Sequence, residues 1–181
     1  MNIFPYFAEN CSCKAIAKNE KAKEKKMQLT QKEETLLKDL KGQEQLCVDK
    51  YTRYSSEARD PQLKNLFSQI AAVEKGHFGL LTQIGEGNSN PNVNASGAVN
   101  SSVASDFTEK YTQTDSEDKT HDCYLCTDLI ATEKHASSLY DTCIFEFTND
   151  SVRNALAGIQ KEEQQHAKRV YDYMKKNGMY S

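Results

Sequence analysis

Apolar and polar residues alternate along two parts of the chain with the period of an α-helix. Apolar positions recur there at steps of three and four residues, which places them on one face of a helix. Each part contains two such stretches separated by a short polar break. The pattern therefore predicts four helices in two hairpins, at residues 30–84 and 120–176, and an all-α bundle in which each helix buries one face.

The predicted helix ends carry residues that start and stop helices. Asp60 and Pro61 supply an N-cap and a proline at the first position of the second helix. Asn149 stands at the equivalent place before the fourth helix. Gly85 and Gly178 are residue types that end helices. We therefore expect a tight turn within each hairpin.

Two segments outside the hairpins have compositions that do not favour a packed core. Residues 1–29 form a polar leader, and residues 85–119, rich in Asn, Ser, Gly and Thr, predict a flexible linker. This linker is longer than an up-down-up-down bundle requires, but it suits a connection that crosses the length of the bundle. We therefore expect a ferritin-like four-helix bundle made of residues 30–84 and 120–176, with the second hairpin segment extending over 120–181.

The two hairpins repeat the same chemical groups at the same spacing. In each, a glutamate precedes a Glu-x-x-His motif by 30 positions, and the two sets are 89 residues apart. The six residues are Glu44, Glu74, His77, Glu133, Glu163 and His166. One glutamate from each of two helices, with one Glu-x-x-His from each of the other two, is the ligand set of a carboxylate-bridged two-metal site in a four-helix bundle.

All four glutamates fall on the apolar stripes, so the pattern places them inside the bundle. At about 1.5 Å per residue, Glu44 and Glu74 lie about 22 and about 21 Å from the turn at Asp60, which makes them level. Buried carboxylates cost several kcal/mol each unless they are protonated, paired or metal-bound. Lysines and arginines fall off these stripes, so two divalent cations would balance the charge. Imidazole with bridging carboxylates favours iron or manganese, and we predict two such ions.

Simpler interpretations exist for some of these residues. A single Glu-x-x-His can be a surface pair in an ordinary helix. Tyr51 and Tyr140, which also repeat, are expected to pack in the core, with a role beside the metal ligands as the alternative. His135 points about 200° round the helix from Glu133 and is expected at the surface or boundary.

Six cysteines are present. Cys47 and Cys143 fall on core faces and are predicted to be buried apolar residues. The others form two close pairs, Cys11/Cys13 and Cys123/Cys126. A zinc site from these four is an alternative, but 110 positions separate the pairs and neither has knuckle residues.

The overall composition bears on partners and location. The chain has 181 residues, a net charge of −3 and a mean hydropathy of −0.75, which gives no electrostatic case for binding nucleic acid or an anionic membrane. No apolar run approaches the roughly 18 residues of a membrane span. Glu9 and Asn10 interrupt the region where a secretory signal would be apolar. We therefore expect synthesis in the cytoplasm without a signal peptide.

Several segments of the second hairpin form a recognisable set: residues 128–135, 138–140, 162–167 and the tail at 171–180. Together they resemble the coat F family of spore coat proteins from endospore-forming bacteria, and the first hairpin resembles it more loosely. The resemblance implies a ferritin-like fold, a place in the spore coat and other coat proteins as partners. It implies no defined activity.

The ligand pattern is also similar to that of rubrerythrin-type di-iron peroxidases. The spacing between glutamates is shorter here, and no rubredoxin-like electron-transfer module is present. Our first interpretation is therefore a structural or assembly protein of the spore coat with a two-metal carboxylate site, with homo-oligomerisation left open. The alternative is a rubrerythrin-like di-iron or di-manganese peroxidase or oxidoreductase of oxidative-stress defence. Metal storage ranks third because nothing suggests a closed cage.

Overall fold

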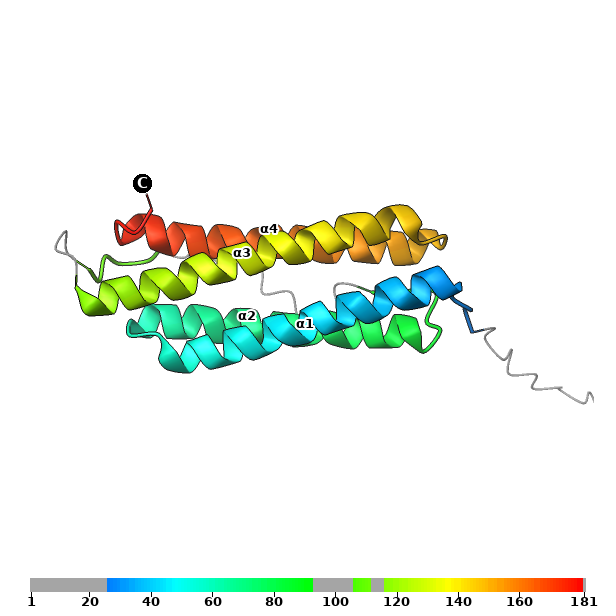
Figure 1. The fold of residues 1–181 in the computed structure, drawn as a ribbon, viewed down its shortest axis with the longest axis horizontal. Coiled ribbons are helices and arrows are strands. Elements are labelled where there is room, and N and C mark those ends of the chain that lie inside the picture. Colours follow the sequence, from blue (N-terminus) through cyan, green and yellow to red (C-terminus); the bar gives the residue numbers. More distant parts are fainter. Residues whose placement is uncertain (1–25, 93–105, 112–115, 181) are drawn as a thin grey trace, which may run out of the picture.

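A computed structural model describes residues 26–92, 106–111 and 116–180 of the chain. The described residues form four helices: α1 (Gln31–Glu57), α2 (Pro61–Gly85), α3 (Glu117–Glu146) and α4 (Asp150–Lys176). Figure 1 shows two antiparallel hairpins, α1 with α2 and α3 with α4, lying side by side along one long axis. The predicted all-α bundle of two helical hairpins is confirmed.

The capping residues explain where the helices begin. The Asp60 side chain caps α2 and that of Asn149 caps α4, as the sequence predicts. The third helix begins at Glu117, three residues before the predicted start at 120. The reason is Ser116, whose hydroxyl accepts a hydrogen bond from the Lys119 amide at 3.1 Å and so supplies an N-cap within the polar segment.

The two hairpins pack with α1 against α3 and α2 against α4. Figure 1 shows that α2 ends at one end of the bundle and α3 begins at the opposite end. Helices α2 and α3 therefore run in the same direction, and the end of α2 and the start of α3 lie at opposite ends of the bundle (Figure 1). The described residues 106–111 lie against the bundle, where Tyr111 is buried and Phe107 packs on the core.

The apolar core forms two blocks, one toward each end of the bundle. One block includes Leu63, Phe67 and Leu129, and the other includes Leu40 and Ile84. On every helix the motif glutamate lies between residues of one block and residues of the other. The predicted ligands therefore occupy the middle layer of the bundle, with apolar side chains on both sides.

Buried carboxylates at the two ends hold the hairpins together. At one end, Glu33 at the start of α1 accepts from the Thr148 amide at 2.8 Å, just before α4. At the other end, Asp122 of α3 accepts from the amides of Arg59 and Asp60 at 2.7 and 3.0 Å. These bonds tie each hairpin turn to the opposite hairpin, which keeps the motif residues of the two hairpins level.

Candidate metal centre

Each helix brings its motif glutamate into the middle layer of the bundle. Glu44 comes from α1 and Glu133 from α3, and the two Glu-x-x-His motifs come from α2 and α4. The four glutamates are at most 1 % exposed, whereas His77 and His166 are 0 % and 4 % exposed. The six residues singled out in the sequence thus lie together in one buried cluster.

The cluster divides into two overlapping groups of four residues. In each group, one nitrogen or oxygen from every residue lies within 4.8 Å of those from the others. Glu74 and Glu163 belong to both groups. The group that also contains Glu44 and His77 we name half-site one, and the group that also contains Glu133 and His166 we name half-site two. Each group can hold a metal ion, and the two groups share two carboxylates.

Both imidazoles turn their Nδ1 atom toward the carboxylates. His77 Nδ1 lies 2.9 Å from Glu163 Oε1 and 3.3 Å from Glu74 Oε2. His166 Nδ1 lies 2.8 Å from Glu74 Oε1 and 3.8 Å from Glu133 Oε1. The two rings stack, with their centroids 5.8 Å apart. Each half-site therefore has one imidazole nitrogen among its carboxylate oxygens.

Two buried tyrosines reach across the α1–α3 interface to the outer glutamates. The Tyr140 hydroxyl donates to Glu44 Oε1 at 2.5 Å, and the Tyr51 hydroxyl donates to Glu133 Oε1. The exchange is reciprocal, since each hairpin supplies the tyrosine that binds the glutamate of the other. Tyr51 and Tyr140 therefore pack in the core, as predicted, and their hydroxyls also contact two of the predicted ligands.

A further carboxylate, Glu162, contacts the cluster and was missed by sequence reasoning. Its Oε2 lies 2.6 Å from His77 Nε2, on the side of the ring that faces away from the other carboxylates. A carboxylate in this position fixes the tautomer and orientation of a histidine ligand. Glu162 directly precedes Glu163 in the sequence, but its repeat equivalent is Val73, so the internal duplication did not mark it.

Burial and mutual repulsion oppose full ionisation of the cluster. Burial raises the pKa of Glu44 and of Glu163 to about 8, although His77 acts in the opposite direction. Burial, followed by repulsion from Glu163 and Glu74, raises the pKa of Glu133 well above its usual value. Without cations, three of the four carboxyl groups therefore favour the neutral form.

Glu74 and His77 are the exceptions. Burial acts to raise the pKa of Glu74, but the imidazoles of His166 and His77 outweigh it and lower that pKa below its ordinary value. Burial acts to lower the pKa of His77, but Glu162 and other carboxylates outweigh it and raise that pKa. Without cations, the positive charge of the His77 imidazolium therefore balances the ionised Glu74 carboxylate, and the other three carboxyl groups have no such balance.

The cluster also contains polar atoms without hydrogen bonds. Among residues 26–92, 106–111 and 116–180, the buried side-chain atoms that lack a partner are Glu44 Oε2, Glu74 Oε1, Glu133 Oε2, Glu163 Oε1 and Oε2, and His166 Nδ1. Two of them, His166 Nδ1 and Glu74 Oε1, lie within ion-pair distance of each other but outside hydrogen-bond geometry. An unsatisfied buried group costs about 1–3 kcal/mol. Carboxylate oxygens with imidazole nitrogens are donors that iron and manganese accept, so the residues fit two such ions.

The remaining histidines lie away from the cluster. His135 is exposed, as predicted. His121 is half-buried, and its Nε2 lies 3.2 Å from the Glu57 carbonyl oxygen.

Among the cysteines, Cys47 and Cys143 are buried, which confirms their predicted core positions. Cys126 is also buried and Cys123 is half-buried. The zinc alternative requires Cys11 and Cys13, which lie outside the described residues.

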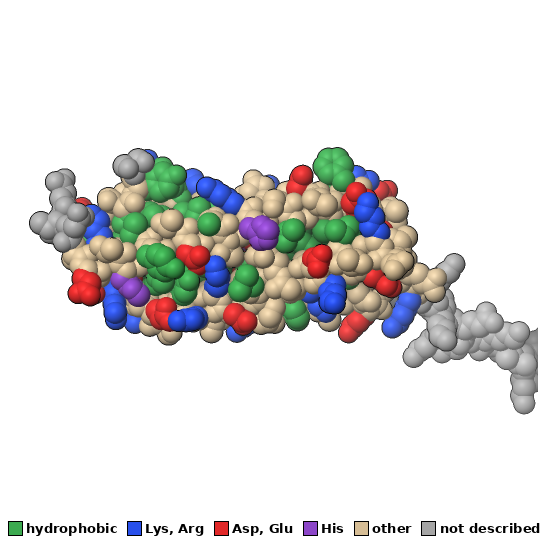
Figure 2. Space-filling model, viewed as in Figure 1, with side chains coloured by type: hydrophobic (Ala, Val, Ile, Leu, Met, Phe, Trp, Pro, Cys, Tyr) green, Lys and Arg blue, Asp and Glu red, His purple; other side chains and the backbone are tan. Residues whose placement is uncertain are grey.

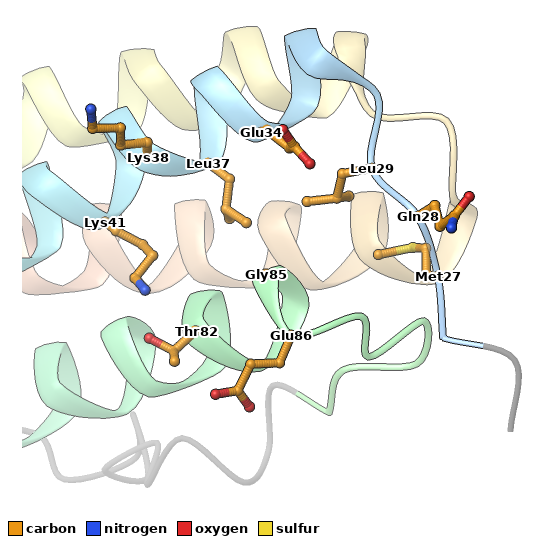
Figure 3. A pocket seen from close by; sticks show the side chains of 10 residues that line it. All are labelled: Met27, Gln28, Leu29, Glu34, Leu37, Lys38, Lys41, Thr82, Gly85 and Glu86. Carbon is orange, nitrogen blue, oxygen red and sulfur yellow. The ribbon is translucent and has the colours of Figure 1, made fainter. Parts of the chain in front are cut away.

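A separate pocket of about 790 Å³ lies where the start of α1 meets the end of α2 (Figure 3). Met27 and Leu37 form part of its apolar lining. Lys41 and Glu86 both belong to it as well, so the lining carries charges of both signs. Its lining includes none of the six cluster residues, and it adds nothing to the metal centre.

The surface carries mixed charge on the face shown in Figure 2, where lysine, arginine and acidic side chains are interspersed. Within the part of the chain that the structure describes, no helix combines the length and apolar character needed to span a membrane.

Residues 121–181 match the family model of the Coat F domain. The match covers nearly all of the second hairpin and confirms there the resemblance that its motifs indicated. The comparisons with curated proteins and with solved structures found no match. Three of the six cluster residues lie in the first hairpin, outside the matched region.

Proposed function

We propose that this protein is a structural or assembly component of the spore coat whose bundle holds two iron or manganese ions. The Coat F domain at residues 121–181 supports the location and the expectation of other coat proteins as partners. One observation carries the metal proposal: the six residues of the repeated motif converge on two buried groups that share Glu74 and Glu163.

The two ions would act first as cross-links between the hairpins. Half-site one draws its residues from α1, α2 and α4, and half-site two from α2, α3 and α4. Glu74 and Glu163 would be ligands in both half-sites, so each ion would be held by both hairpins at once. Four positive charges would offset four carboxylates whose burial is otherwise unfavourable. Metal binding would therefore be coupled to the stability of the fold, as it is in other metal-bound domains.

Neighbouring residues position the ligands. The hydroxyls of Tyr140 and Tyr51 hold Glu44 and Glu133 from across the α1–α3 interface, and Glu162 holds the His77 ring. Hydrogen bonds of this kind orient metal ligands and strengthen binding. Iron or manganese, when bound, would supply Lewis acidity and electron-transfer chemistry.

An oxidoreductase function is the second candidate. Its support is the same ligand set, together with two buried tyrosine hydroxyls in direct contact with predicted ligands. Under this alternative the protein would be a rubrerythrin-like peroxidase of oxidative-stress defence. Consumption of peroxide by metal-loaded protein with a supplied reductant separates the two candidates. A coat component whose metal is structural would show no turnover above that of free metal.

Metal content is the decisive test of the proposed centre. Full-length protein incubated with Fe(II) without oxygen, or with Mn(II), and then desalted should retain close to two ions per chain. Glu74→Gln removes a shared ligand and should reduce the content below one. Asp172→Asn is the matched control, because it removes one acid from α4 at a surface ion pair with Lys168. A wild-type protein that retains no metal would refute the centre.

Location tests the other half of the proposal. A fluorescent fusion or immunogold labelling in sporulating cells should place the protein at the forming coat. Uniform labelling of the mother cell, with none at the spore surface, would contradict the coat assignment.

A further inference from the structure

The two half-sites are not equivalent, although the sequence that forms them is duplicated. Glu162 Oε2 lies 2.6 Å from His77 Nε2 in half-site one. The position equivalent to Glu162 in the first hairpin is Val73, a buried aliphatic residue on α2. Among the described residues, the polar contacts of His166 are all made by its Nδ1, toward Glu74 and Glu133. Within the part of the chain that the structure describes, His77 therefore has a carboxylate on its Nε2, and His166 does not.

The exposed fractions of the two histidine side chains also differ between the half-sites. The His77 side chain is 0 % exposed, and Glu162, which covers its outer nitrogen, is 16 % exposed. The His166 side chain is 5 % exposed. The outer edge of half-site one is thus closed by a negative charge from α4, whereas half-site two lacks that cover.

A positive charge adds to the difference on the side of half-site two. Arg169 follows His166 by one helical turn, so both residues share a face of α4. Its Nη2 donates to Gln69 Oε1 at 2.7 Å, and the side chain is only partly exposed. The residue at the equivalent position near half-site one is Leu80. The guanidinium interacts electrostatically with Tyr51, whose hydroxyl binds Glu133 of half-site two, so its positive charge opposes the entry of a cation there. Half-site one has no charged residue at the equivalent position.

We propose that Glu162 makes half-site one the high-affinity position, which fills first, and leaves half-site two as the weaker and exchangeable position. This inference rests on the proposed two-metal centre. A carboxylate hydrogen-bonded to the outer nitrogen of a ligating histidine typically contributes about 10–100-fold to metal affinity. Glu162 is a positioning residue, since it acts on the metal through His77 and belongs to neither half-site.

Two matched variants isolate the half-sites. Glu133→Gln removes a ligand found only in half-site two, and Glu44→Gln removes its counterpart from half-site one. Glutamine keeps an oxygen that accepts the tyrosine hydrogen bond in either place. Co(II) is the probe, titrated without oxygen and followed by its visible absorption. Glu133→Gln should bind one Co(II) about 10–100-fold more tightly than Glu44→Gln does.

Glu162 is then tested directly within these backgrounds. Adding Glu162→Gln to Glu133→Gln should remove most of the advantage in affinity. Adding Val73→Glu to Glu44→Gln places a carboxylate at the equivalent position and should tighten Co(II) binding. The second variant keeps the test informative if the first disturbs the fold, which thermal unfolding would reveal. Asp172→Asn on α4 should change neither affinity.

The outcomes separate this inference from the centre on which it rests. Two Co(II) bound by the wild type, with equal affinities in the two half-site variants and no effect of Glu162→Gln, would overturn the inference and leave the metal centre standing. A wild type that binds no Co(II) would overturn both.

Discussion

Replacing Glu163 with glutamine should have opposite effects on stability with and without metal. Burial raises the pKa of Glu163 to about 8, whereas a carboxyl group in the unfolded chain ionises near 4.5. At pH 7 the metal-free native state therefore keeps this group protonated. At about 1.36 kcal/mol per pH unit, the roughly 2.5 units between 4.5 and 7 cost about 3 kcal/mol. Glutamine has a similar shape and carries no such cost, so the metal-free variant should be more stable by up to this amount.

The sign of the pH dependence follows from the raised pKa. A group whose pKa is higher in the native state leaves stability intact below its unfolded pKa and reduces it as the pH rises toward its folded pKa. The difference between wild type and Glu163→Gln should therefore be small near pH 4.5 and grow up to about pH 8. With metal bound, the order of stability should be reversed, so that wild type is more stable than Glu163→Gln. One ion at 100 times its Kd adds about 2.7 kcal/mol, and Glu163 belongs to both half-sites.

Urea unfolding measures both effects. Wild type and variant are compared at pH 7 with EDTA and with excess Mn(II), and the EDTA series is repeated at pH 5. Asp172→Asn, at an exposed ion pair on the same helix, should stay within about 0.5 kcal/mol of wild type throughout. If metal-free Glu163→Gln is less stable than wild type at pH 7, the buried carboxyl group does not carry the cost inferred here and the reasoning fails.

Two further substitutions test the supports of the cluster. Glu33→Gln weakens the hydrogen bonds from Thr30 and Thr148, which outweigh burial and lower the pKa of Glu33. The variant should lose about 1–2 kcal/mol of unfolding free energy at pH 7, measured with urea. This loss should disappear as the pH falls through the lowered pKa of Glu33. An equal loss in acid would contradict this prediction. Tyr140→Phe removes the hydrogen bond to Glu44 and should cost about 1–3 kcal/mol, seen as a lower thermal midpoint; an unchanged midpoint would argue against that bond.

Local patterns in the sequence were enough to predict the helices and the buried positions of the motif glutamates. Caps such as Asp60 and Asn149 act within three residues of themselves, and the step of three and four residues places Glu133 between Leu129 and Ala136 on one face. These are short-range properties of a helix, so they can be read from the chain. Repetition of the same set at a constant interval then distinguished the buried motif glutamates from ordinary surface acids.

Contacts between residues of different hairpins could not be predicted in the same way. Tyr51 is paired with Glu133, and Glu162 with His77, at separations of 82 and 85 residues. Such pairs depend on how α1 lies against α3 and α2 against α4, which no local pattern states. Glu162 was missed for this reason, and also because the adjacent Glu163 already completes the Glu-x-x-His motif with His166.

The chain itself thus determines an all-helical bundle with a repeated set of acids and imidazoles on its buried faces, because helical periodicity and capping are local. The packing of the hairpins decides which residues the two half-sites share. It also decides which of the two cluster histidines has a carboxylate on its outer nitrogen. The duplication relates the two halves in sequence, but Val73 and Glu162 face different partners once α2 meets α4. That difference exists only where side chains distant in the chain come within hydrogen-bond distance.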